Sequence, residues 1–128
     1  MLYQIAHRAR LEGWVIPYPP PPPPVQAPES PLDLPRSAPV LIGPHNAFLV
    51  TVTLISIRAG SEPLSVRLIA SNVPGAYPVL IAGPAQLSQV GQSVSLDSGI
   101  TGYAFAQARF ESTVGGYVFS AYLNTYRR

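Results

Sequence analysis

The chain has 128 residues, a length that suits one domain, and it lacks cysteine, which excludes disulfides and thiolate metal sites. Charged residues make up 11% of the sequence, whereas an average globular protein has about 25%. The formal net charge of +2 and the scatter of the eight arginines argue against a nucleic-acid partner. With 47% hydrophobic residues, the chain is expected to expose apolar surface that other protein subunits cover.

Residues 1–14 form the first predicted element, a short helix or an anchoring hook. The apolar residues Leu2, Ile5 and Ala9 follow helical spacing, and Gly13 ends the pattern. An isolated helix of this length is marginal in water, so it needs a surface on which to dock. We expect that surface to belong to a partner.

A belt from Pro17 to Pro44 holds twelve of the sixteen prolines. Proline fixes φ and lacks a backbone N–H, so the belt is excluded from helices and central strands. Its first eight residues predict a polyproline II rod of roughly 25 Å, which loses little entropy when a partner binds it. Trp14 stands just before the rod, and it is expected either to fill a pocket of a partner or to fold back onto its own domain.

These patterns predict a set of partner-binding anchors along the arm. They are Leu2, Ile5, Trp14, Ile16, Tyr18, Pro19, Pro20, Pro21, Pro22, Pro23 and Pro24.

From Ala47 onward the hydrophobic period changes to two, which predicts strands. The inward-facing residues of the first two strands are expected to be Phe48, Val50, Val52, Leu54, Leu64, Val66, Leu68 and Ala70. The predicted strands span residues 47–57, 64–70, 79–82, 87–90, 93–96, 103–111 and 117–126. Short turns and the lack of a helical period between them favour an all-β fold, a small antiparallel β-sandwich or barrel of six to seven strands. The predicted organisation is an arm of residues 1–46 and a β-sandwich domain of residues 47–128.

A membrane-spanning segment is not predicted, because prolines and glycines interrupt the longest charge-free run, Leu68 to Leu96. Catalytic and metal-binding patterns are also missing from the sequence. His7 and His45 are 38 residues apart, and His45 is expected to cap the entry into the first strand of the domain. Asp97 and Glu111 are the carboxylates with the best chance of meeting, although turn and surface roles explain them better. We therefore expect no enzyme activity, no cofactor, no metal and no small-molecule substrate.

The organisation, rather than any motif, resembles small structural proteins of virus particles, such as the head-decoration and cement proteins or the minor capsid and tail components of tailed bacteriophages. The resemblance implies a virion protein, assembled in the host cytoplasm, whose arm straps onto neighbouring subunits and whose β domain forms an oligomer or sits on a capsid lattice. The alternative is a ligand- or glycan-binding module tethered by the arm. In that case the tyrosines Tyr103, Tyr117, Tyr122 and Tyr126 would stack on sugars, unless they belong to the core or to an interface.

Overall fold

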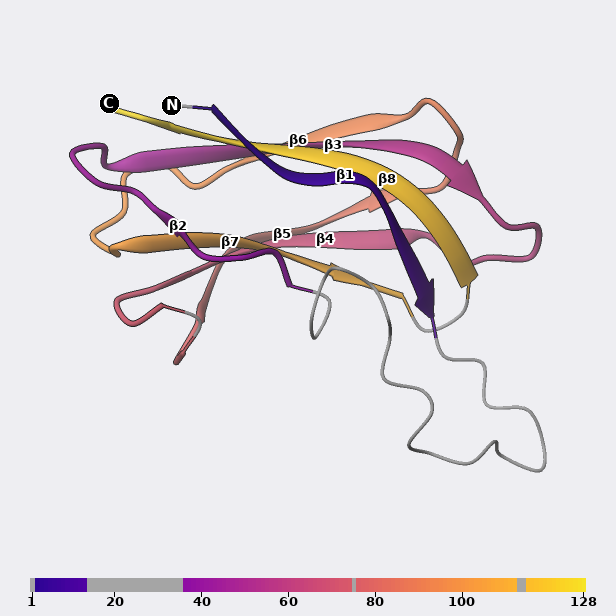
Figure 1. Cartoon of the computed structure of the whole chain (residues 1–128), viewed down its shortest axis with the longest axis horizontal. Helices are drawn as coiled ribbons and strands as arrows, with labels where there is room; N and C mark the ends of the chain where they lie inside the picture. Colours follow the sequence, from indigo (N-terminus) through magenta and orange to yellow (C-terminus); the bar gives the residue numbers. More distant parts are fainter. Residues whose placement is uncertain (1, 14–35, 75, 113–114) are drawn as a thin grey trace.

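The computed structural model describes residues 2–13, 36–74, 76–112 and 115–128, and these form two antiparallel four-stranded sheets packed face to face (Figure 1). The first sheet has the order β1-β8-β3-β6, with β1 Leu2–Gly13, β8 Gly115–Tyr126, β3 Ala47–Ile57 and β6 Ser93–Asp97. The second has the order β2-β7-β4-β5, with β2 Val40–Leu41, β7 Phe105–Glu111, β4 Leu64–Ser71 and β5 Val79–Leu87. The expected all-β fold is confirmed as two sheets, with eight strands in place of six or seven.

Two strands, β1 and β2, lie before residue 47, where the sequence predicts no strand, and the predicted strand over 87–90 is wrong, because residues 88–90 lie in the turn between β5 and β6. The predicted helix over residues 1–14 is also wrong for its described part, because β1 occupies it. β1 pairs with β8 along its length, but its register shifts twice, between Gln4 and Ala6 and between Ala6 and Ala9. Each bulge adds a residue, so the buried positions Ala6 and Ala9 stand three apart instead of two. That spacing imitates one face of a helix.

β5 also differs from its prediction, because it runs through Gly83 and Pro84 instead of stopping before them. The strand lies at the edge of its sheet, where a proline without an N–H costs no ladder hydrogen bond on the open side. Its register against β4 shifts twice, between Val66 and Leu68 and again between Leu68 and Ile69. The first of these bulges accommodates Gly83 and Pro84 within the strand.

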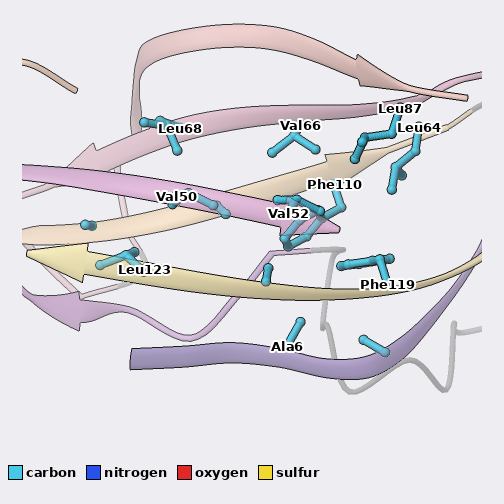
Figure 2. Packing of buried hydrophobic residues seen from close by; sticks show 14 of the residues in the cluster. Ala6, Val50, Val52, Leu64, Val66, Leu68, Leu87, Phe110, Phe119 and Leu123 are labelled. Atoms are coloured by element: carbon cyan, nitrogen blue, oxygen red, sulfur yellow. The ribbon is translucent and has the colours of Figure 1, made fainter. Parts of the chain in front are cut away.

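The core lies between the two sheets and is built from alternate residues of each strand (Figure 2). All the inward-facing residues predicted for β3 and β4 are buried. The rings of Phe110 on β7 and Phe119 on β8 join the sheets, with centroids 4.4 Å apart and planes tilted by 38°. Ala6, Ala9 and Leu11 of β1 belong to the same buried cluster. The first strand of the chain is therefore part of the sandwich.

Truncating Leu11 tests whether β1 contributes to the core. Leu11 is 4% exposed, so Leu11→Ala is expected to lower the free energy of unfolding by about 2–5 kcal/mol in urea titrations. Leu2→Ala on the same strand is the matched control, because Leu2 is 65% exposed and should change stability by less than about 0.5 kcal/mol. Equal, small effects of both substitutions would mean that β1 is a hook and not a core strand.

Candidate functional site

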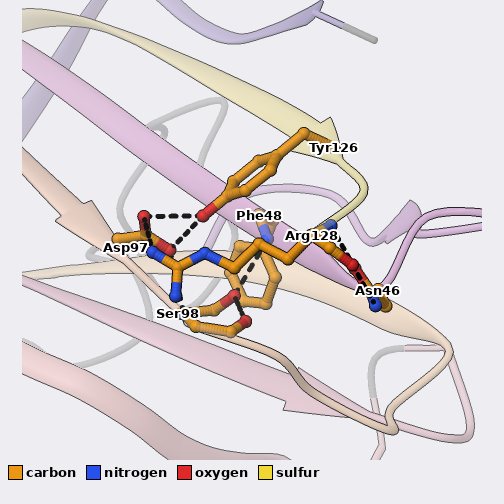
Figure 3. Close-up of polar contacts among 7 residues, drawn as sticks. Asn46, Phe48, Asp97, Ser98, Tyr126 and Arg128 are labelled. Carbon is orange, nitrogen blue, oxygen red and sulfur yellow. Dashed lines mark hydrogen bonds and ion pairs between the residues drawn. The ribbon is translucent and has the colours of Figure 1, made fainter.

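A polar cluster around Asp97 ties together three strands at the C-terminal end of β8 (Figure 3). The Tyr126 hydroxyl donates to the Asp97 carboxylate, whose two oxygens lie 2.5 and 2.6 Å away. The two residues come from β8 and β6, so this contact crosses β3, the strand between them. The Gly99 N–H donates to Asp97 Oδ1 at 2.8 Å, and Arg128 Nη2 lies 3.5 Å from Oδ2.

The hydrogen bond also changes the pKa values of both partners. Donation from Tyr126, and then from the Gly99 N–H, lowers the pKa of Asp97 below its usual 3.8. The same bond to Asp97 raises the pKa of Tyr126 above 10.0. At neutral pH the carboxyl is ionised and the phenol keeps its proton, so the hydrogen bond links β8 to β6 without proton transfer. We call the pair of Asp97 and Tyr126 the Asp97 latch.

Removing the Tyr126 hydroxyl should change how stability depends on pH. The lowered pKa of Asp97 stabilises the fold above the unfolded-state value of about 3.9, and this is lost as pH falls through the folded value. The raised pKa of Tyr126 stabilises the fold below about pH 10, and this is lost as pH rises through its folded value. The difference in melting temperature between wild type and Tyr126→Phe is therefore expected to be largest at intermediate pH and to shrink at both extremes.

Tyr122→Phe is the control for that experiment, because the Tyr122 hydroxyl accepts a hydrogen bond from the Gln4 amide, 3.3 Å away. The difference in melting temperature between wild type and Tyr122→Phe should therefore not shrink at acid pH. A Tyr126→Phe difference that stays constant from acid to alkaline pH would contradict the latch.

An open cleft of about 390 Å³ lies beside the β3–β4 turn. That turn is at the other end of the sandwich from the C-terminal end of β8 (Figure 1). It is lined by Glu62, Pro63, Ser65, Gln86, Glu111 and Ser112. The Glu111 carboxylate forms ion pairs with Arg67 and, at 2.5 Å, with Arg109. Glu62 is exposed. Asp97 is on the other sheet and shares no site with Glu111.

Both histidines contact uncharged groups. His7 Nδ1 lies 3.0 Å from the amide nitrogen of Gln4, and His45 Nδ1 lies 2.8 Å from Thr125 Oγ1, which joins the entry of β3 to β8. In residues 2–13, 36–74, 76–112 and 115–128, no three His, Asp or Glu side chains are grouped so that they could hold a metal ion. The same part of the chain contains no helix long and apolar enough to cross a membrane.

The predicted arm anchors fall into two groups. Leu2 is exposed on β1, and Ile5 packs partly against the core. The remaining anchors, Trp14, Ile16, Tyr18 and the six prolines that follow, lie outside the described residues. The polyproline II rod stays a prediction for the same reason.

The tyrosines proposed for sugar stacking occupy different environments. Tyr117 is buried in the core, where its hydroxyl contacts the Glu62 carbonyl, so of the two alternatives the core role holds for this ring. Tyr103 packs partly against the core, and Tyr126 is held by Asp97. Tyr122, 41% exposed, is the ring of the four that stands open. A single open ring is a weak platform for a glycan.

Among the described residues, four of the nine exposed large apolar side chains lie on the edge strand β5 and the loop before it. Val73, Tyr77, Val79 and Leu80 are all exposed, with Tyr77 at 86% and Leu80 at 56%. They lie within a run of 29 residues that carries no charge. We call these four residues the apolar edge. Sequence reasoning found the charge-free run but not the exposure, which depends on β5 being the last strand of its sheet.

Comparison with models of protein families gives no match, and searches of curated proteins and of solved structures give none either.

Proposed function

We propose that the protein is a non-enzymatic structural protein that works inside an assembly, where other protein subunits cover its surface. The observation that carries this proposal is the apolar edge. Four large apolar side chains stand open within a charge-free segment, and clustered exposed apolar surface of this kind marks contacts with other proteins.

The geometry of β5 supports a protein partner in particular. Edge strands present unpaired N–H and C=O groups to which another chain can hydrogen-bond, and proteins that stay monomeric guard such edges with charges, bulges and proline. β5 carries no charge. The register shift between Leu80 and Ala82, together with Pro84, leaves the stretch of Val79 and Leu80 as the part best suited to pairing. This stretch is also the exposed, apolar part.

The assembly we propose is a virion, following the resemblance in organisation. A small body with few charges suits a place in a shell, where buried apolar area supplies the attraction between subunits. A pre-stiffened arm suits the same place, because it loses little entropy on binding. The proposed location is the particle, after assembly in the host cytoplasm.

Making the apolar edge polar tests the proposal. We expect the full chain to self-associate, or to bind its particle, and Tyr77→Ser combined with Leu80→Gln to reduce that association at least tenfold, because about 1.4 kcal/mol of lost burial already gives a factor of ten. Sedimentation velocity over a concentration series measures it.

Val90→Ser is the matched control, since Val90 is 64% exposed but lies on the β5–β6 turn outside the apolar edge. It should associate like the wild type. A wild-type chain that stays monomeric at every concentration and does not bind its particle would contradict the assembly role.

The arm needs a gentler change than deletion, because residues 2–13 form a core strand. Replacing residues 14–35 with a Gly/Ser linker of equal length should leave the sandwich folded while weakening incorporation into the assembly, since a flexible linker must be ordered on binding. Near-ultraviolet circular dichroism checks the fold, and co-sedimentation measures incorporation. Undiminished incorporation would mean that the segment is a spacer and not a strap.

A further inference from the structure

Three arginines stand in one row across the second sheet. Arg67 on β4 is directly opposite Arg109 on β7, and Arg109 is in turn opposite Arg36, which forms a bridge just before β2. Residues directly opposite each other put their side chains on the same face, with Cβ atoms about 4.5–5.5 Å apart. Three guanidinium side chains therefore line up on the outer face of this sheet. We call them the arginine row.

The charge of the arginine row is only partly balanced. Glu111 is ion-paired with both Arg67 and Arg109, and within the described ranges no carboxylate lies within ion-pair distance of Arg36. Three positive charges and one negative charge leave an excess of +2 at this place. The row is open to solvent, since the Arg109 side chain is 48% exposed and that of Arg67 33%.

Such a row is unfavourable for the isolated fold. Like charges placed directly opposite each other on a sheet destabilise it. The chain has eight arginines, and three of them stand in this one row. An incoming anion would relieve that repulsion, which gives the site a driving force for binding.

We propose that the arginine row binds a carboxylate of an acidic peptide segment belonging to a partner protein. Glu111 already shows that a carboxylate fits between these guanidinium groups. Guanidinium groups hold carboxylates through paired N–H donors, an arrangement that lysine does not provide. The inference rests on the proposed function, because it assumes a protein subunit as the partner, but it uses a different surface from the apolar edge.

The surroundings of the row favour a peptide over a nucleic acid. The adjoining cleft offers Ser65 and Gln86, which are uncharged groups suited to a peptide backbone. An excess charge of +2 also neutralises little of a polyanion.

Peptide binding to the full chain tests the inference. The probe is an end-blocked, fluorescein-labelled peptide of alternating Glu and Ser, followed by fluorescence anisotropy at low and at physiological salt. Wild type is expected to bind it in a salt-dependent way and to ignore the same peptide with Gln in place of Glu. Arg36→Gln should weaken binding about tenfold, the effect of losing one charge-assisted hydrogen bond. The peptide affinity of Arg36→Lys should fall between those of the wild type and Arg36→Gln.

The matched control is Arg10→Gln, which removes the same charge from an exposed arginine of β1 on the other sheet and should leave binding unchanged. Melting temperatures equal to that of the wild type show that the variants fold.

Four results would overturn the proposal. One is equal weakening by Arg10→Gln and Arg36→Gln, which would indicate net charge and not a site. Another is tighter binding of an oligothymidylate with the same number of charges, which would indicate a polyanion. The third is binding about tenfold tighter in a Glu29→Gln, Asp33→Asn variant, which would mean that the chain's own carboxylates fill the row. Failure to bind the Glu peptide at all would count equally against it.

Self-association separates this inference from the proposed function. Arg36→Gln leaves the apolar edge intact, so it should associate like the wild type in sedimentation. Normal association together with unaltered peptide binding by Arg36→Gln would remove the arginine row and leave the assembly role standing. If the chain stays monomeric and its peptide binding depends on Arg36, the arginine row stands and the assembly role is contradicted.

Discussion

The whole structure depends on β8, the strand that is paired on both sides within the first sheet and that supplies one wall of the core. It hydrogen-bonds to β1 and to β3, and its inner residues Tyr117, Phe119, Ala121 and Leu123 are all buried. Phe119 meets Phe110 of the opposite sheet, so this strand also fixes how the sheets face each other. The Asp97 latch holds its C-terminal end, and β1 covers its outer edge. Without β8, β1 would lose its pairing partner and the β3–β6 pair would be cut off from it.

Hydroxyl groups take the place of charges on the solvent face of that sheet. Thr51 and Ser95 lie 3.0 Å apart across β3 and β6, and Thr53 and Ser93 lie 2.7 Å apart in the next row. Such cross-strand pairs satisfy polar groups without ions. The ion pairs of Asp97 and Glu111 lie at two places, the Asp97 latch and the arginine row.

The sequence predicted the regular strands well and the irregular ones badly, for one physical reason. β8, most of β3 and the first half of β4 keep a period of two, so their buried faces could be assigned from the pattern of apolar residues. β1 breaks that period at two bulges, and β5 contains Pro84. Both strands therefore deviate from the proline-free alternation of apolar and polar residues that predicts a strand. The candidate site was harder still. Arg36, Arg67 and Arg109 are far apart in the chain, and only strand register brings them into one row.

The apolar edge and the arginine row are complementary in what each can contribute to an assembly. Apolar burial supplies most of the attraction but is not directional, so an edge strand by itself allows many partners and registers. Charge pairing adds little net affinity, yet it selects the partner and fixes its orientation, because a misplaced carboxylate leaves arginines unpaired. In the proposed assembly, the three arginines that strand register brings together would supply the directional contacts that the apolar edge lacks. An acidic segment seated on the row would therefore decide which neighbour the apolar edge meets.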